Sequence, residues 1–417
     1  MKEESSLAYK SFKENLARYF NLKFIKISFL IAFLLSFFIF GLHFCKPNSV
    51  LANLVGLFGL ALGLVGLWWL LNSRREVWFF TGCFVGLFWF YWISFSLRYF
   101  DIMWAIGFEI LFISLAYGVI FGVIGWFENK LLRAALLVAV GYLYPLDFNW
   151  LNFEILFSQT PFYPSPFSLF AVLVGLAFLS LWRGVLLVAA LVGSLGVFWE
   201  EEAAQTSLNI ALLNTSTPQD FKWQQDNAGQ IISQNFALID EAIKSNADLV
   251  VLPETAFYLP LNKNTILLDE LKKRSQKAAI LTGALAYENG KAFNSAFLFQ
   301  NGEMKRFDKV VLVPFGERNP LPQPLAGVVE RLFFGQESEF SPANNISNYS
   351  VGGEMFRNAI CFEATRPEFY EDSPKFIVAI SSLAWFEPST ARTLQRLLIT
   401  RLERLNGVKV FHAINAG

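Results

Sequence analysis

The apolar positions of this chain are concentrated in its first half, where they form long runs bounded by charged residues. Residues 27–45, 47–73 and 77–97 carry no charge, and residues 102–127 carry only Glu109. Each run is close to or longer than the ~20 residues that an α-helix needs to cross a bilayer. The pattern therefore predicts four membrane-spanning helices before residue 128.

Three shorter apolar runs follow, at residues 134–146, 167–182 and 184–199, so we expect about seven spans and a transmembrane helical domain over residues 1–200. An odd number of spans places the two ends of this domain on opposite sides of the membrane. Lys and Arg concentrate in cytoplasmic loops. Two of them, Lys46 and Arg98, fall in one set of loops. Eleven fall in the other set: Lys2, Lys10, Lys13, Arg18, Lys23, Lys26, Arg74, Arg75, Lys130, Arg133 and Arg183.

The charge bias predicts a multi-pass membrane protein whose N-terminus is cytoplasmic and whose second half lies outside. In a bacterial cell this corresponds to the inner membrane, with the second half in the periplasm. A transporter or receptor with an external binding domain is the competing interpretation from another functional class. It requires several polar or charged residues within the spans. The long runs offer mainly Glu109, which argues against it.

After residue 200 the pattern changes to short apolar segments that alternate with amphipathic ones. Asn289-Gly290 lies between two strand-like segments and predicts a hairpin turn. Strands and helices that alternate in this way predict one α/β domain over residues 201–417. Strands are expected at 207–213, 248–252, 279–286, 292–299, 310–313, 355–361, 376–381 and 408–414, and helices at 225–245, 265–277 and 389–406.

Composition limits the chemistry. The formal net charge is zero and no basic face is predicted, so nucleic-acid binding has no support. Cys45 and Cys83 lie with apolar runs, which argues against a disulfide framework. The two histidines, His43 and His412, are too few for a histidine-rich metal site, and we expect neither a metal nor another cofactor.

Three predicted strand ends carry ionisable groups of different type: Glu254, Lys309 and Cys361. A carboxylate can take the proton of a thiol, and a nearby lysine lowers the pKa of that thiol and can stabilise an oxyanion. Such a set suffices for acyl transfer through a thioester. Each residue also has an ordinary structural interpretation, as a helix cap, a solvated lysine or a buried core cysteine.

Three motifs occur in the order found in the nitrilase superfamily: Leu252-Pro253-Glu254-Thr255-Ala256, Asp308-Lys309-Val310 through Pro314-Phe315-Gly316-Glu317, and Ile360-Cys361-Phe362-Glu363. With its multi-span first half, the chain resembles the apolipoprotein N-acyltransferase family over nearly its whole length. The resemblance implies an α-β-β-α sandwich. It also implies a triad in which Glu254 is the general base, Lys309 stabilises the tetrahedral intermediate and Cys361 carries the acyl group.

The resemblance assigns supporting roles as well. The family's further essential carboxylates fall on Glu317 and Glu363, which could orient Lys309 or the incoming amine or could simply pair with Arg318 and Arg366. The residues that match family positions near the substrate are Trp223, Asn294 and Trp385. Phe362 stands where the family usually has tyrosine, so a hydroxyl role there is lost.

The implied reaction is ping-pong. A phospholipid such as phosphatidylethanolamine gives its sn-1 acyl chain to Cys361, and the α-amine of a diacylglyceryl-cysteine on an apolipoprotein then takes it. A membrane-anchored amidohydrolase with the same triad is the closer alternative. We expect a monomer. Residues 325–334 and 257–261 are candidates for a lid that dips into the bilayer, and many family members continue beyond residue 417 with a closing transmembrane helix.

Overall fold

The computed structural model describes residues 20–47, 49–99, 102–179, 184–314, 316–319 and 340–416. The chain divides into two compact units. The membrane unit comprises Met1–Ser94, Met103–Leu143 and Asn149–Trp199. The α/β unit comprises Phe95–Ile102, Tyr144–Phe148 and Glu200–Gly417, so two short segments of the first half belong with the second.

In the part of the chain that the structure describes, four apolar helices are long enough to span a bilayer, which confirms the four long runs of the sequence. The third and fourth each combine an α-helix with a 3-10 helix. The elements are α2 (Leu22–His43), α3 (Val50–Leu71), α4 (Arg75–Phe90) continued by η1 (Tyr91–Tyr99), and η2 (Met103–Ala105) continued by α5 (Ile106–Trp126).

The expected total of about seven spans is not confirmed among the described residues. The later runs form α6 (Lys130–Ala139), α7 (Pro166–Ala177) and α8 (Gly184–Gly193), of 10, 12 and 10 residues. At 1.5 Å per residue these helices are roughly 15–18 Å long, against a hydrocarbon core of about 30 Å. Short 3-10 turns lie between and after them: η3 (Val140–Tyr142), η5 (Phe153–Phe157) and η6 (Gly196–Phe198).

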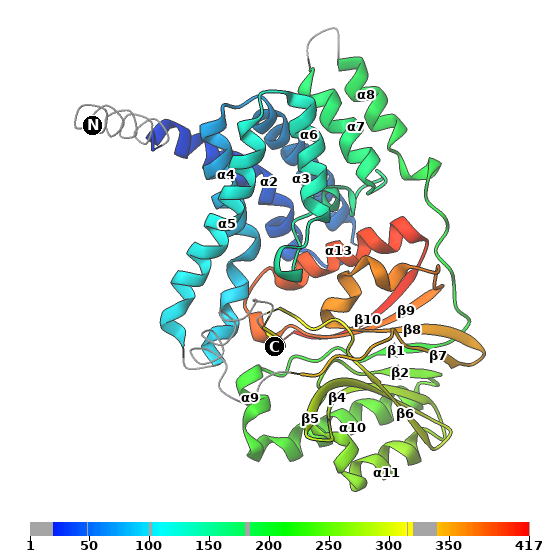
Figure 1. Cartoon of the computed structure of the whole chain (residues 1–417). Helices are drawn as coiled ribbons and strands as arrows, with labels where there is room; N and C mark the ends of the chain where they lie inside the picture. Colours follow the sequence, from blue (N-terminus) through cyan, green and yellow to red (C-terminus); the bar gives the residue numbers. More distant parts are fainter. Residues whose placement is uncertain are drawn as a thin grey trace. The chain divides into compact units, whose positions relative to one another are not determined.

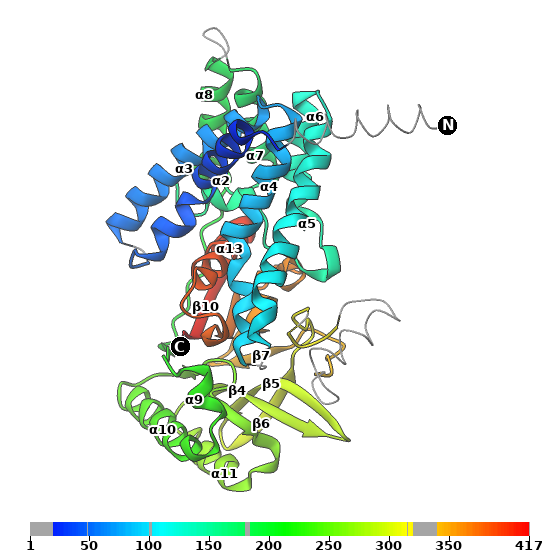
Figure 2. The same cartoon turned by 90° about the vertical axis from the view of Figure 1, so that its left-hand side faces the viewer.

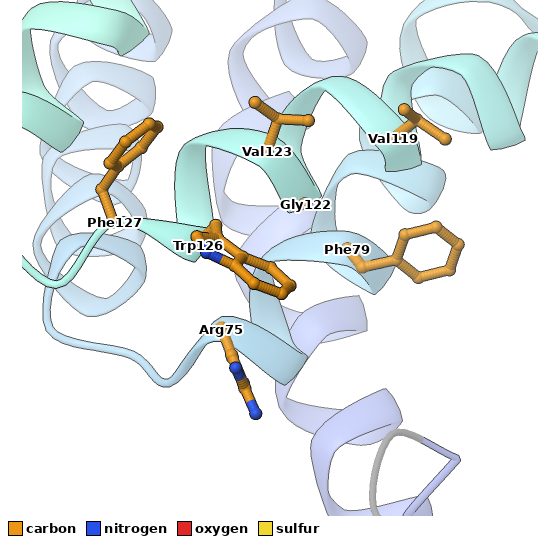
Figure 3. A pocket seen from close by; sticks show the side chains of 7 residues that line it. All are labelled: Arg75, Phe79, Val119, Gly122, Val123, Trp126 and Phe127. Carbon is orange, nitrogen blue, oxygen red and sulfur yellow. The ribbon is translucent and has the colours of Figure 1, made fainter. Parts of the chain in front are cut away.

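Glycines allow α4 and α5 to lie side by side at close range (Figure 2). A Cβ on Gly125 would come within 2.4 Å of the Trp78 Cβ, so only glycine fits there. An apolar groove of about 400 Å³ lies along the same two helices (Figure 3). None of the predicted site residues lines it; its walls are Arg75, Phe79, Val119, Gly122, Val123, Trp126 and Phe127.

The α/β unit contains two sheets (Figure 1). The first has the order β1-β2-β4-β5-β6, with β3 paired to β4, and the second has the order β10-β9-β8-β7. The strands of the first are β1 (Ile210–Leu212), β2 (Leu249–Val251), β3 (Phe257–Pro260), β4 (Ala279–Glu288), β5 (Lys291–Gln300) and β6 (Glu303–Asp308). Those of the second are β7 (Asn348–Val351), β8 (Glu354–Ile360), β9 (Phe376–Ser382) and β10 (Lys409–Asn415).

Among the described residues of the unit, four helices and several 3-10 turns accompany the sheets. The helices are α9 (Gln219–Trp223), α10 (Ala228–Lys244), α11 (Thr265–Arg274) and α13 (Ala391–Asn406). The 3-10 turns are η4 (Pro145–Asp147), η7 (Gln225–Asn227), η8 (Leu261–Lys263), η10 (Cys361–Thr365), η11 (Pro367–Tyr370) and η12 (Ala384–Phe386).

Three apolar clusters make the unit an α-β-β-α sandwich, as the resemblance implied. In β2, Leu249 and Val251 face the second sheet while Val250 faces α10 and α11. This is the alternation that a strand buried on both faces requires. On the outer face of the second sheet, Ile399 and Leu402 of α13 cover β8 and β9.

Two expectations within this unit are corrected. Residues 310–313 form no strand; the neighbouring strand is β6, which ends just before Lys309. The lid expected at residues 257–261 is corrected in part, because Phe257 and Leu261 are fully buried in the cluster beneath α10 and α11, whereas Tyr258 is exposed. The other lid candidate, residues 325–334, lies outside the described residues.

Candidate active site

Cys361 stands at a sharp turn directly after β8. Ile360 is fully buried, whereas Cys361 is partly exposed and begins η10. The backbone of Cys361 has φ of +57°, a left-handed conformation that is uncommon for any residue other than glycine. Such strain is found where a fold fixes a functional group. The turn therefore ends the strand and holds the thiol at the edge of the sheet.

Glu254 follows β2 in a second left-handed turn, in which Thr255 has φ of +49°. One carboxylate oxygen, Oε1, accepts a 2.7 Å hydrogen bond from Asn294 Nδ2, and the other, Oε2, accepts a 2.8 Å hydrogen bond from the backbone N–H of Ser382. The charge of this carboxylate also acts on the Cys361 thiol. Glu254 is thus buried, both of its oxygens are oriented by hydrogen bonds, and its charge acts on the thiol.

Lys309 lies beyond the end of β6 and is only 1% exposed. Its Nζ is 2.8 Å from an oxygen of Glu317 and 3.4 Å from Oε1 of Glu254. Asn294 connects the same two carboxylates, since its Nδ2 lies 2.7 Å from each. Three sequence-predicted residues, Asn294, Lys309 and Glu317, therefore surround Glu254 in one network.

Glu363 connects the Cys361 turn to the segment after Lys309. Its Oε2 accepts a 2.6 Å hydrogen bond from the N–H of Ile360, the residue before the cysteine. Its Oε1 accepts from the N–H groups of Val310 and Val311, at 2.6 and 3.0 Å. The carboxylate is 1% exposed, so the structure assigns it to backbone positioning, not to a salt bridge with Arg366.

Burial and charge set the protonation of the cluster. Burial and then the charge of Glu254 raise the pKa of the Cys361 thiol, while the charge of Lys309 opposes this shift. Burial disfavours the charged form of Lys309, but the carboxylates of Glu317 and Glu254 outweigh it and raise the pKa of that ammonium. Burial raises the pKa of Glu363 to about 7. The resting site therefore holds a protonated thiol beside a carboxylate and a fixed cation.

Three aromatic rings make mutual edge-to-face contacts within the α/β unit. Trp223 and Trp385 lie 5.2 Å apart between ring centroids, at 77°. Tyr99, from the first half of the chain, lies 5.8 Å from Trp223 and 5.5 Å from Trp385. The two predicted tryptophans are thus neighbours, and Tyr99 is a third ring that the sequence did not suggest.

A model of the apolipoprotein N-acyltransferase integral membrane domain matches residues 22–198. A protein of Wolinella succinogenes named apolipoprotein N-acyltransferase is 36% identical over 392 residues, which cover 92% of each chain. The chain belongs to the apolipoprotein N-acyltransferase family. A second relative of that name, from Helicobacter hepaticus, is 34% identical over 88% of this chain and 92% of its own. With its apolar helices, this family member is a bacterial membrane protein.

Solved structures give weaker matches. A CN-hydrolase superfamily protein of Xanthomonas campestris aligns with a TM-score of 0.39 and 18% identity, over 51% of this chain and 77% of its own. An amidase of the nitrilase superfamily from Nesterenkonia aligns with a TM-score of 0.36 and 15% identity, over 51% of this chain and 78% of its own.

Phe362, the residue after the candidate nucleophile, is a packing residue. It is 2% exposed, and its ring stacks on Phe148 with centroids 5.7 Å apart. The guanidinium of Arg366 lies over the rings of both Phe362 and Tyr144. Segment Tyr144–Phe148 of the first half therefore supports the residue after the thiol.

Two further polar residues lie at Glu254, and the sequence did not predict either of them as a site residue. Ser382, at the end of β9, orients the carboxylate through its backbone N–H. Lys222, in α9, is 5% exposed, and the charge of Glu254 acts on its ammonium. A backbone contact and a lysine next to a tryptophan are common features, so only the structure reveals their place at the site.

The described residues contain no group of three histidine, cysteine or carboxylate side chains arranged to hold a metal ion. A thiol, a carboxylate base and a buried ammonium can form and cleave a thioester with no other group.

Proposed function

We propose that this protein transfers an acyl chain from a phospholipid to the N-terminal amine of a lipoprotein, through a thioester on Cys361. The observation that carries the proposal is the buried ion pair of Glu254 and Lys309, whose charges both act on the Cys361 thiol. It stands in a chain of the apolipoprotein N-acyltransferase family. The donor is proposed to be phosphatidylethanolamine or a similar phospholipid, and the acceptor the diacylglyceryl-cysteine of an apolipoprotein.

In the first half-reaction Glu254 takes the thiol proton while Sγ attacks the carbonyl carbon of the sn-1 ester. The ammonium of Lys309 faces the oxyanion that forms. The tetrahedral intermediate collapses by breaking the bond to the sn-1 oxygen, and that oxygen takes the proton from Glu254. A lysophospholipid leaves, and the acyl group stays on Cys361.

In the second half-reaction the α-amine attacks the thioester carbonyl and Glu254 takes one of its protons. The carbon–sulfur bond breaks, and the thiolate recovers the proton from Glu254. Glu317 and Asn294 keep Lys309 and Glu254 in place through both steps. Trp223 and Trp385 are proposed to contact the substrates.

The proposed setting is the inner membrane, with the N-terminus in the cytoplasm and the α/β unit in the periplasm. The excess of Lys and Arg in alternate loops supports this orientation. It requires an odd number of crossings, so we propose that the part of the chain that holds α6, α7 and α8 adds an odd number of crossings to those of the four long helices. We further propose that the protein acts as a monomer.

The acceptor separates this proposal from a membrane-anchored amidohydrolase, which would pass the acyl group to water. Purified protein with an acylated Cys361 is divided between buffer and buffer that contains a diacylglyceryl-cysteinyl peptide. We expect the peptide to gain the acyl group at least tenfold faster than free fatty acid appears in buffer alone. Equal rates of loss in the two samples would instead identify a hydrolase.

A further inference from the structure

Lys222 is a buried lysine beside the candidate base. It lies in α9, is 5% exposed and has no carboxylate within ion-pair distance among the described residues. Its Nζ lies 3.4 Å from Thr255 Oγ1 and 3.4 Å from Ser382 Oγ. Thr255 directly follows Glu254, and the backbone N–H of Ser382 donates to Glu254 Oε2. The ammonium therefore lies within hydrogen-bond distance of both segments that position the Glu254 carboxylate, at Thr255 and at Ser382.

A lysine buried without a direct carboxylate partner costs stability. Burial lowers the pKa of Lys222 to about 8, and the charge of Glu254 acts in the opposite direction. A role in packing alone would be served by an apolar side chain of similar length. The position of Lys222 therefore points to an electrostatic role at Glu254.

The charges around Glu254 show what that role is. Lys309 lies on the Oε1 side, but it is shared with Glu317, to which it is closer. The Cys361 thiol adds a further negative charge when it loses its proton. Two carboxylates and one ammonium already carry a net negative charge, which opposes ionisation of the thiol. Lys222, on the Oε2 side, supplies the second cation that balances it.

We propose that Lys222 is a positioning residue for the reaction. It fixes the turn that carries Glu254 through its contacts with Thr255 and Ser382, and its charge stabilises the negative charge that Cys361 and Glu254 share once the thiol is ionised. This inference rests on the proposed role of Glu254 as the base. It assigns to α9 a function in the first chemical step that is separate from any contact with substrate.

The test measures the alkylation of Cys361 by iodoacetamide between pH 5 and 10, with peptide mass spectrometry to separate it from Cys45 and Cys83. Lys222→Met keeps the length of the side chain and removes its charge. Below pH 8 the ammonium of Lys222 is charged and favours ionisation of the thiol, so we expect the alkylation rate of Lys222→Met to be about tenfold lower than that of the wild type at pH 6.5 and to approach it above pH 9. Lys222→Arg should keep the rate near the wild-type value. Lys273→Met, an exposed change on α11, is the matched control and should leave it unchanged.

The coupling between the charges of Lys222 and Glu254 is reciprocal, so a second test can be made on protein that keeps Lys222. The ε-amine of Lys222 is labelled with acetic anhydride as a function of pH in the wild type, in Glu254→Gln and in the exposed control Glu241→Gln. The midpoint for Lys222 should fall in Glu254→Gln alone. Melting temperatures of all variants report whether the fold is intact.

An alkylation profile of folded Lys222→Met that superimposes on the wild type would show that Lys222 only packs. If that variant does not fold, an unchanged labelling midpoint in Glu254→Gln overturns the proposal on its own. Neither measurement uses a lipid. Their outcome is therefore independent of whether Cys361 accepts an acyl chain.

Discussion

Gly283 of β4 is the position where the smallest possible change should disable the candidate base. A Cβ there would lie 2.5 Å from Glu254 Cα, 2.6 Å from the backbone nitrogen of Thr255 and 2.7 Å from the carbonyl oxygen of Pro253. Real Cβ contacts are essentially never shorter than 3.0 Å and are ordinary from 3.4 Å. To reach these limits from 2.5 Å, Gly283→Ala must move the backbone of Glu254 away from the new Cβ by about 0.5–0.9 Å.

That displacement disturbs the short hydrogen bonds that orient the Glu254 carboxylate. Glu254 is held at 2.7 Å by Asn294 and at 2.8 Å by Ser382, and it must meet the Cys361 thiol. A misplacement of about 1 Å at a catalytic group can cost about 100-fold in rate. We expect Gly283→Ala to slow acylation of Cys361 by about 10- to 100-fold. Overpacking should also cost about 1–3 kcal/mol of stability.

The assay is the rate at which intact mass reports acyl-enzyme after phospholipid is added, with the melting temperature measured on the same samples. Gly229→Ala is the matched control, because a Cβ at Gly229 on α10 meets nothing within 4 Å. In a helix this change should stabilise by up to about 1 kcal/mol and leave the rate unaltered. If Gly283→Ala acylates at the wild-type rate, the placement of Glu254 does not govern the first step.

Two further predictions concern buried polar groups near the site. At pH 8, Glu363→Gln should lower stability by about 1–3 kcal/mol, because the amide presents a donor where Glu363 accepts from the backbone N–H of Ile360; an unchanged melting temperature would contradict this. Burial and then Arg392 lower the pKa of His412 to about 3, and its Nε2 lies 2.8 Å from Ser381 Oγ. The unfolded chain therefore binds more protons below about pH 6.5, and stability should fall by up to about 1.4 kcal/mol per pH unit as the pH drops from 6 to 4. His412→Gln should flatten that slope, and a slope that persists would assign it to another group.

Much of the fold could be predicted from local pattern. The hairpin of β4 and β5 follows from two alternating segments joined by Asn289-Gly290, and both turn residues adopt the positive φ that such a turn requires. The four long apolar runs became four long helices because nothing interrupts them. The later runs are shorter, and Gly141 and Pro145 follow α6 within a few residues. Hydropathy alone could not determine how much helix they form.

The expected strand at residues 310–313 shows why local pattern fails at the site. Val310 and Val311 have high strand propensity, but their N–H groups donate to Glu363 instead of a neighbouring strand. The N–H of Val313 likewise donates to Glu317. A backbone that binds carboxylates cannot be recognised from the apolar side chains that it carries.

The candidate site could be predicted only in part for a related reason. Glu254, Lys309 and Cys361 each follow a strand, and the two sheets bring them together across the sandwich. Tyr99 joins Trp223 and Trp385 from more than a hundred residues away. No periodicity in the sequence connects positions at that separation.

The central claim is that Cys361 carries the acyl group, and intact mass tests it most directly. Purified full-length protein is incubated with phosphatidylethanolamine, phosphatidylglycerol or cardiolipin and measured before and after treatment with hydroxylamine. We predict the mass of one added acyl chain, located on Cys361, removed by hydroxylamine and missing in both Cys361→Ala and Glu254→Gln. The account is contradicted if no phospholipid gives an adduct, or if an adduct forms equally well in Cys361→Ala.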